Sequence, residues 1–192
     1  MATSPKSAPE TGWDDLYELA EGQSGHFSAQ QADEIGFYPQ RLQKYLLSKR
    51  IERVRRGIYR LTHFPPSEHE ELVVYWLWTE CAGVYSGETA LNLHELSDAL
   101  PAQQHLTLPE SWASRRLRAP TGIVLHFADI LDTDRSWVGP VPVTKPKRTV
   151  EDCIELHVQP DLVEQAIAQA KDRGLVTRAT ATKLSKMASG KA

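Results

Sequence analysis

A short break between two helix signals, around Gly36, most constrains what this chain can fold into. Ser28 precedes Ala29 and has Gln31 three residues on, which is the spacing of a capping box at the start of a helix. Gly36 favours the end of that helix, and Pro39 suits the first turn of another. Two helices joined by so tight a turn form a helix-turn-helix, whose second helix enters the DNA major groove in known complexes.

Apolar spacing places this pair of helices within a larger helical pattern. An earlier helix is predicted by a stripe at positions i, i+3, i+4 and i+7: Trp13, Leu16, Tyr17 and Ala20. In the helix after Pro39, an inward face is formed by Leu42, Tyr45 and Leu46. The outward positions of that helix carry side chains that can hydrogen-bond to base edges. We therefore expect base reading by Gln40, Arg41, Gln43 and Lys44.

Charge is concentrated in one segment of an otherwise acidic chain. The formal net charge is −3, yet residues 36–62 hold eight basic residues and only one acidic residue, for a sum of +7. Residues 1–35 sum to −6, and residues 63–192 sum to −4. A local basic block indicates a surface for a polyanion, because phosphate contacts depend on local rather than total charge.

The second half of the basic block predicts a β-hairpin wing. Residues 51–55 and 58–61 form two short β-type runs, and Gly57 supplies the freedom that a tight turn needs. Arginine on such a wing can hold phosphates or enter a narrow minor groove. Contacts to the DNA backbone are expected from Ser28, Lys49, Arg50, Arg53, Arg55, Arg56 and Arg60.

The rest of the chain predicts a mixed α+β domain. Capping-box spacing occurs twice, at Ser67 with Glu70 before a nearly all-apolar helix, and at Thr149 with Asp152. Short extended pieces are expected at 105–108, 123–127 and 141–144. A late helical stripe consists of Leu162, Val163, Ala166, Ile167 and Ala170, and Gly174 follows it.

These patterns predict an α+β protein in three parts. They are a flexible N-terminus at 1–12, a winged helix-turn-helix at 13–64, and an α+β domain at 65–192 that begins near the Pro65-Pro66 break. A hydrophobic content of 41% with 24% charged residues is typical of a globular protein with a packed core. The chain has no apolar run near the ~20 residues of a membrane span and no secretory signal, so we expect a cytoplasmic protein.

Four sequence pieces in this order resemble the AbiEi family of type IV antitoxins and related transcriptional regulators. They are residues 53–61 in the wing, 84–94, 105–109, and 143–149 with Asp152. The resemblance covers about residues 13–175. It implies a repressor that binds operator DNA, expected as inverted repeats, with a homodimer on DNA as one option. It also implies a nucleotidyltransferase-like toxin as functional partner, opposed without a required stable complex.

The residues predict no catalytic, metal or cofactor site. Cys153 and His157 have helical i, i+4 spacing, but two ligands do not close a zinc site. Cys81 and Cys153 are expected as buried free thiols. The acidic cluster Asp129, Asp132 and Asp134 is not followed by the carboxylate-x-Lys pattern of a nuclease strand. Two alternatives stay open: a DNA-targeted enzyme of the restriction-endonuclease-like class, and a repressor whose second domain senses a small ligand.

Overall fold

The computed structural model describes residues 12–190, so all but one residue of the segment expected to be flexible, 1–12, lies outside the described part. The chain divides into two compact units, an N-terminal unit that ends at Glu80 and a C-terminal unit that begins at Cys81. The sequence had placed this division at 64/65. The difference concerns one helix, α4 (Glu70–Trp78), which lies against strands of the N-terminal unit.

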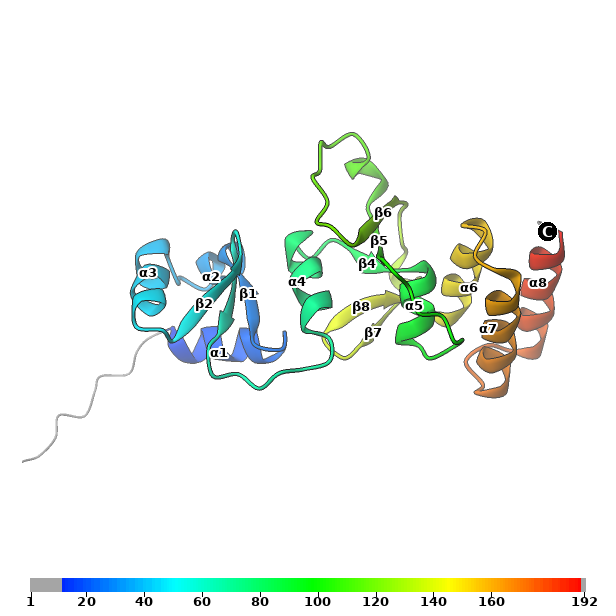
Figure 1. Ribbon diagram of the computed structural model, residues 1–192, viewed down its shortest axis with the longest axis horizontal. Helices are drawn as coiled ribbons and strands as arrows, with labels where there is room; N and C mark the ends of the chain where they lie inside the picture. The colour runs from blue at the N-terminus through cyan, green and yellow to red at the C-terminus, as the bar shows by residue number, and fades with distance from the viewer. Residues whose placement is uncertain (1–11, 191–192) are drawn as a thin grey trace, which may run out of the picture. The chain divides into compact units, whose positions relative to one another are not determined.

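The N-terminal unit is a winged helix-turn-helix (Figure 1). Before α4, its elements are α1 (Trp13–Glu21), β1 (His26–Ser28), α2 (Ala29–Glu34), α3 (Pro39–Leu47), β2 (Ile51–Arg55) and β3 (Ile58–Leu61). The three strands form an antiparallel sheet in the order β1-β3-β2. Strand β1 was not predicted, because its three residues are too few to show an alternating pattern. It pairs with β3 and thereby attaches the wing to the start of α2.

The predicted cap of α2 is confirmed. The Ser28 hydroxyl accepts a hydrogen bond from the Gln31 backbone N–H, and the Gln31 side chain accepts one from the Ser28 N–H. Gln31 also donates to Gln23 at 2.8 Å, and Gln23 donates to the carbonyl of His26. This polar chain fixes the start of α2 against β1. Gly36 follows at φ +75°, where glycine meets no steric penalty.

The core of the N-terminal unit is mainly aromatic and aliphatic. Phe27 and Tyr59 stack across the sheet with ring centroids 5.7 Å apart, and Phe37 contacts Tyr45 of α3 at 5.1 Å. The fully buried members of this cluster include Leu16, Ala20, Phe27, Ala32 and Phe37. Burial of such side chains stabilises the fold by ~1.5–3 kcal/mol for each large residue. The core therefore holds α3 rigidly against the sheet.

The segment before α4 corrects one expected cap. Glu70 accepts a hydrogen bond from the backbone N–H of Ser67, as a capping box requires, but the Ser67 hydroxyl donates to the hydroxyl of Ser24 instead of capping the helix. The helix consequently begins at Glu70, later than predicted. Its apolar character was predicted correctly, since five successive residues, Val73 to Leu77, are buried.

The C-terminal unit combines a five-stranded mixed sheet with helices, as the α+β prediction stated. Its elements are β4 (Val84–Tyr85), α5 (Gly87–Leu93), β5 (Gln104–Leu108), η1 (Glu110–Trp112), β6 (Ile123–Phe127), η2 (Asp132–Asp134), β7 (Arg135–Val138), β8 (Val141–Thr144), α6 (Pro146–Glu155), α7 (Pro160–Asp172) and α8 (Arg178–Ser189). The strand order is β6-β5-β4-β8-β7, with parallel pairs β4/β8 and β5/β6. Three of these strands were predicted, whereas β4 and β7 were not.

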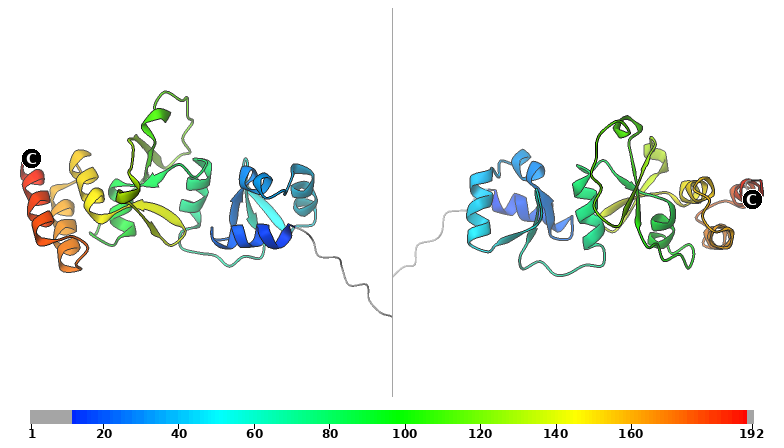
Figure 2. Two further views of the ribbon diagram at one scale, coloured as in Figure 1. Left: turned by 180° about the vertical axis from the view of Figure 1, so that it is seen from behind. Right: turned by 45° about the horizontal axis from the view of Figure 1, so that its top comes forward.

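Helices α6, α7 and α8 lie side by side and share a core with α5 (Figure 2). The predicted stripe on α7 is confirmed, with Val163, Ala166, Ile167 and Ala170 all buried, and Gly174 follows at φ +69°. Helix α8 was not predicted. It begins at Arg178 behind a Thr177 cap, and its Ala181 and Leu184 join the same core.

The expected capping box at Thr149 and Asp152 is wrong. Helix α6 already begins at Pro146, so both residues lie inside it. The Thr149 hydroxyl donates to the carbonyls of Thr144 and Lys145, which ties the helix to the end of β8. Asp152 is paired with Arg148 instead. Thr149 thus connects α6 to β8, and Asp152 forms an i,i+4 pair within the helix, so neither side chain caps the helix start.

Two cysteine side chains differ in their surroundings. Neither forms a disulfide within residues 12–190, and Cys153 is buried as expected, so burial raises the pKa of its thiol. Cys81 is only half-buried and follows α4 at φ +63°, so the expectation of a buried residue holds for Cys153 alone. His157, which has i, i+4 spacing from Cys153, is exposed beyond the end of α6.

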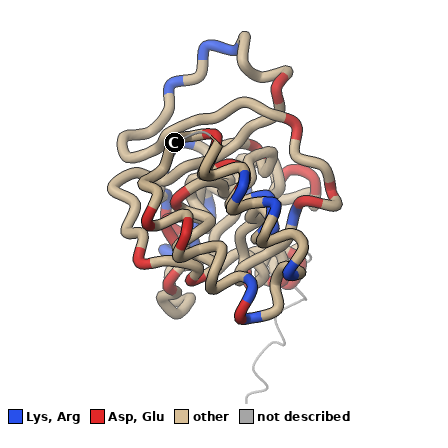
Figure 3. The backbone as a smooth tube through the Cα atoms, turned by 90° about the vertical axis from the view of Figure 1, so that its right-hand side faces the viewer, with Lys and Arg blue, Asp and Glu red and all other residues tan. Residues whose placement is uncertain are grey.

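Two further observations describe the surface. Within residues 12–190, no helix is both long and apolar enough to cross a bilayer. The loop between η1 and β6 carries Arg115, Arg116 and Arg118, and Figure 3 shows basic positions along a projecting loop. Arg115 is stacked over the ring of Trp112 at 3.8 Å. This loop places basic charge in a unit that the sequence had led us to regard as acidic.

Candidate nucleic-acid interface

Helix α3 is set into position by its own sequence. Pro39 occupies the first turn, where its missing N–H is not needed, and Leu42 and Tyr45 are buried on the inner face. The rest of the inner face is formed by the half-buried Leu46. The helix is nine residues long and ends at Leu47, whose side chain is 76% exposed. One face of α3 is therefore anchored in the core and the opposite face is left to solvent.

The four residues expected to read bases all lie on that outer face. Gln40, Arg41, Gln43 and Lys44 are exposed. Two of them rest against rings of the same unit. The Arg41 guanidinium lies 5.4 Å from the centroid of Phe37, and the Lys44 ammonium lies 5.7 Å from that of Tyr45. These contacts direct the two cations along the helix surface while their charged ends stay accessible.

Tyr38 is a surface residue that the sequence analysis did not single out. It caps α3 through its backbone, and its side chain is 59% exposed. An exposed aromatic ring at the N-terminal end of α3 adjoins the positions that meet base edges in helix-turn-helix complexes. The available signal was its place directly before Pro39, which puts it outside the buried stripe of α3.

The wing is a two-stranded ribbon with an irregular outer strand. The register between β2 and β3 shifts between Arg53 and Arg55, which leaves Val54 as an extra residue. Arg53 donates to the Tyr59 hydroxyl at 3.3 Å, and Arg55 lies 5.2 Å from the ring centroid of Tyr75. Both arginines remain exposed. A bulge of this kind bends and twists a ribbon, so it sets the direction of the arginine side chains.

The tip of the wing lies beside the start of α2. Arg56 and Gly57 form the turn, with Gly57 at φ +76° and Arg56 exposed. The carbonyl of Gly57 accepts a hydrogen bond from the N–H of Ala29 at 2.8 Å. Ser28, the cap of α2, is paired with Ile58 across the sheet. The tip of the wing is thus tied to the N-terminus of α2, whose Ala29 and Gln31 N–H groups are used within the protein, and Arg56 is left exposed at this edge.

Two arginines from the expected backbone-contacting set have partners within the protein. Arg50 is stacked on Trp13 and Tyr45, with its guanidinium carbon 3.9 Å and 4.9 Å from their ring centroids. Trp13 and Tyr45 are themselves stacked, with ring centroids 4.9 Å apart. Arg50 therefore helps to hold α1 against the C-terminal end of α3. The sequence could not show this, because Trp13 is distant from Arg50 along the chain.

Arg60 points away from the outer surface of the wing. Its guanidinium donates to Glu70 at 3.0 Å and to the carbonyl of Phe64 at 2.9 Å, and it lies 3.5 Å from Glu52. Only 16% of its side chain is exposed. Two carboxylates thus offset its charge, and the residue connects β3 to the segment before α4. Arg60 is placed for a structural role rather than for phosphate contact.

Lys49 lies at the turn between α3 and the wing. It is exposed and has a left-handed backbone conformation, with φ +56°. Four cations of the set expected to contact the DNA backbone are therefore exposed on the N-terminal unit: Lys49, Arg53, Arg55 and Arg56. The structure therefore brings together an outward helix face and a basic ribbon, the two parts of a winged-helix DNA surface.

Comparison with known proteins gives one match to a family model. Residues 14–62 match the family described as "Transcriptional regulator, AbiEi antitoxin". A search of curated proteins returns no match. Among solved structures, the crystal structure of RV2827C protein from Mycobacterium tuberculosis is similar with a TM-score of 0.49 and 15% identity, covering 99% of this chain and 80% of that chain. The family match and the observed fold agree over residues 14–62, which form a winged helix-turn-helix similar to that of AbiEi transcriptional regulators.

Proposed function

We propose that the protein is a sequence-specific repressor that inserts α3 into the major groove of its operator. The observation that carries this proposal is the outer face of α3, where four adjacent polar positions are exposed while the opposite face is buried. Glutamine can pair with adenine, and arginine or lysine can donate to guanine O6 and N7. The wing supplies cations for the phosphates that flank the groove.

The operator that suits this surface is an inverted repeat bound by two copies of the chain. A single helix-turn-helix reads a short half-site, and half-sites in known complexes lie about 34–36 Å or a multiple of this apart. Dimeric binding would double the contacts and raise the discrimination against random DNA. This stoichiometry is part of the proposal and follows from the size of the reading surface.

We also propose that the protein is an antitoxin that opposes a nucleotidyltransferase-like toxin. The family match supports the regulatory half of this role over residues 14–62. The opposing activity is assigned to the C-terminal unit, since a separate compact unit can act independently of DNA binding. No stable complex with the toxin is required in this scheme.

The DNA-binding proposal is tested by selecting duplexes from a random pool with the full chain. The expected result is one enriched motif with two inverted halves, bound with an affinity at least ~10³-fold above that for random DNA. The double variant Gln40→Ala with Gln43→Ala is selected in parallel. It lacks two exposed side chains of α3 that are proposed to read bases, so its enrichment of the motif should be weaker. Enrichment of no motif by the unaltered chain would contradict the proposal.

The antitoxin proposal is tested by expressing a nucleotidyltransferase-like toxin together with variants of this chain supplied from an independent promoter. Variants of the α3 face should derepress a promoter reporter and still protect growth. Removal of residues 81–192 should abolish protection. Full protection by residues 1–80 alone would contradict the role assigned to the C-terminal unit, and loss of protection in the α3 variants would tie antitoxicity to DNA binding.

A further inference from the structure

The C-terminal unit contains a cavity of about 350 Å³ between α6 and the sheet. Its polar residues come from four elements or their ends: Ser86 before α5, Thr107 of β5, His126 of β6, and Arg148, Asp152 and Glu155 of α6. This volume lies at the low end of the range of roughly 300–1,000 Å³ for small-molecule sites. The cavity therefore suits a ring-sized compound rather than a polymer.

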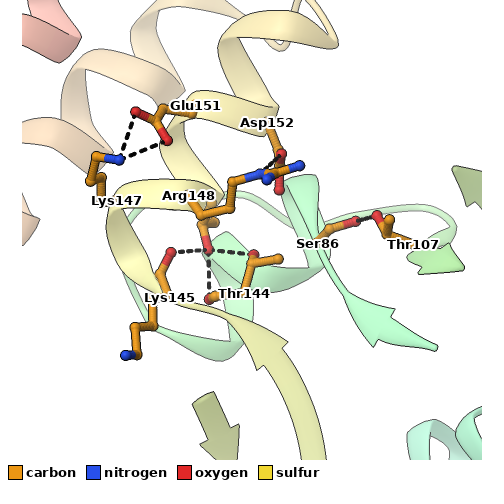
Figure 4. Close-up of polar contacts among 9 residues, drawn as sticks. Ser86, Thr107, Thr144, Lys145, Lys147, Arg148, Glu151 and Asp152 are labelled. Atoms are coloured by element: carbon orange, nitrogen blue, oxygen red, sulfur yellow. Dashed lines mark hydrogen bonds and ion pairs between the residues drawn. The ribbon is translucent and has the colours of Figure 1, made fainter. Parts of the chain in front are cut away.

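One buried oxygen of a residue that lines this cavity has no hydrogen-bond partner among the described residues. Asp152 is 8% exposed, and its Oδ1 accepts a hydrogen bond from Arg148 Nε at 2.7 Å (Figure 4). The other carboxylate oxygen, Oδ2, is buried and accepts no hydrogen bond within residues 12–190. Leaving a buried acceptor unpaired is costly, so most such atoms in folded proteins are satisfied. A donor from a bound molecule would satisfy it.

Apart from the exposed Glu155, the remaining polar groups of the cavity have polar partners within the protein. The hydroxyls of Ser86 and Thr107 hydrogen-bond to each other at 2.7 Å. His126 is 3.0 Å from His105, and burial followed by the nearby His105 lowers the pKa of His126. The charges of Arg148 and Asp152 offset each other within their ion pair. An anionic ligand is disfavoured by such surroundings, because the Arg148 charge is already offset by Asp152 and the exposed Glu155 adds a further carboxylate to the lining.

Apolar side chains complete the cavity. Leu125, Phe127 and Leu156 line it, and Phe127 and Leu156 are each 38% exposed although both are large and hydrophobic. Apolar lining with a few convergent polar groups is typical of sites for small molecules. A flat ring with one polar edge matches this division, since its faces can contact the apolar side chains while its edge meets Arg148 and Asp152.

We propose that this cavity binds a neutral heterocycle of the nucleobase class through a lactam edge. A ring N–H would donate to Asp152 Oδ2, and the adjacent ring carbonyl would accept from the Arg148 guanidinium. The segment 145–152 fixes these two side chains, because the Thr149 hydroxyl anchors the start of α6 to β8. In this proposal Arg148 and Asp152 bind the ligand, and Thr149 holds the start of α6 in place.

The proposal is tested with the full chain and two pairs of nucleosides. Uridine and inosine present a ring N–H beside a carbonyl, whereas 3-methyluridine and 1-methylinosine carry a methyl group in place of that hydrogen. By calorimetric titration and thermal shift, at least one parent nucleoside should bind and raise Tm, and its methylated form should bind about tenfold more weakly or worse. Neither parent binding at about 10 mM, or equal binding of parent and methylated forms, would overturn the proposal.

Substitutions on α6 supply a second arm of the test. Asp152→Asn keeps the size of the side chain but replaces one acceptor oxygen of the carboxylate with an amide NH2 group, which donates. This variant should therefore bind the parent nucleoside at least about tenfold more weakly. Glu151→Gln is the matched control. Glu151 directly precedes Asp152 on the same helix, forms an ion pair with Lys147 and does not line the cavity. This control should bind normally.

The two arms separate a binding role from a structural one. Unchanged nucleoside binding in Asp152→Asn, or an equal loss in both folded variants, would overturn the assignment of Asp152. If Asp152→Asn fails to fold, the methylated nucleosides decide the question in the unaltered protein. DNA binding is not needed for either arm, so failure here would leave the repressor proposal intact.

Discussion

Arginine residues in the basic segment differ in what they contact, and their partners decide their roles. Arg50 and Arg60 are held by rings and carboxylates of the same unit, while Arg56 is exposed at the turn of the wing. Trp13 lies far from Arg50 in sequence, and Glu70 lies ten residues beyond Arg60 in a different element. Composition alone therefore identified a basic surface but could not divide its members into structural and DNA-contacting residues.

Arg60→Ala should destabilise the N-terminal unit by about 1–3 kcal/mol, because it removes charged hydrogen bonds to Glu70 and to the carbonyl of Phe64. Arg56→Ala is the matched control and should leave stability within about 0.5 kcal/mol, as expected for an exposed position. Urea denaturation followed by circular dichroism measures both. A loss of stability in Arg56→Ala equal to that in Arg60→Ala would refute this division.

His26 should make the protein less stable in mild acid. It is 2% exposed, and burial lowers its pKa although its Nδ1 hydrogen-bonds to the carbonyl of Ser24 at 2.9 Å. The unfolded chain therefore takes up a proton before the folded chain does, and stability falls as the pH drops below the ordinary histidine pKa of about 6.5.

The variant His26→Asn retains an N–H donor but cannot titrate. Its loss of stability between about pH 7.5 and about pH 5.5 should be smaller than that of the unaltered protein, as urea midpoints would show. His63→Asn, at an exposed position of the same unit, serves as control. An identical pH response in the His26→Asn variant and the parent chain would show that His26 does not carry the effect.

At the scale of elements, the sequence predicted those with strong local signals. The cap of α2, the start of α3 at Pro39 and the turn at Gly57 depend on neighbouring residues, and all three are present. Strands β1 and β4 have three and two residues and pair with strands distant in sequence, whereas the four-residue β7 pairs with the adjacent β8. The spacing of Ser67 with Glu70 and of Thr149 with Asp152 also misled, because the Ser67 and Thr149 hydroxyls bond to other elements and Asp152 pairs with Arg148 within α6.

The same limit applies to the candidate sites. The outer face of α3 could be derived from helical periodicity, since one buried stripe fixes which positions are exposed. The cavity in the C-terminal unit could not, because Ser86, His126 and Asp152 come from separate elements of a mixed sheet and its helices. Only the fold brings them together.

The wing should act as a sequence-independent clamp. The double variant Arg55→Ala with Arg56→Ala should weaken binding to every duplex, and the slope of log K against log salt should flatten by about 0.9 for each lost phosphate contact. Arg178→Ala with Lys183→Ala removes two exposed cations from α8 and should leave the slope unchanged. Titrations over a range of salt concentrations measure it, and an unaltered slope in the wing variant would show that the wing faces away from DNA.

At the scale of the whole molecule, the position of the boundary changes the electrostatic argument. With the division after Glu80, the C-terminal unit contains 13 basic and 13 acidic residues and is neutral rather than acidic. The separation of DNA binding from the C-terminal unit must therefore rest on geometry, because the loop that carries Arg115, Arg116 and Arg118 can attract phosphate without reading sequence.

A fragment of residues 1–80 should retain the preference of the full chain for operator DNA, and a fragment of residues 81–192 should bind any duplex equally weakly. A shorter fragment, 1–65, should be less stable, because it lacks α4 and the partner that Glu70 provides to Arg60. Fluorescence anisotropy with operator and random duplexes tests this. Operator preference in the 81–192 fragment would contradict the assignment of sequence reading to the N-terminal unit.

The most direct test of the central claim is the ratio of affinities for operator and random duplexes in variants of the α3 face. Gln40→Ala and Arg41→Ala should each lower this ratio, and the binding free-energy difference between operator and random DNA should shrink by roughly 1–3 kcal/mol, because each variant removes contacts to base edges. Gln30→Ala, an exposed glutamine on α2, should leave it unchanged. Competition binding at fixed salt gives the ratio. A ratio unchanged in both α3 variants would contradict the assignment of α3 as the helix that reads DNA.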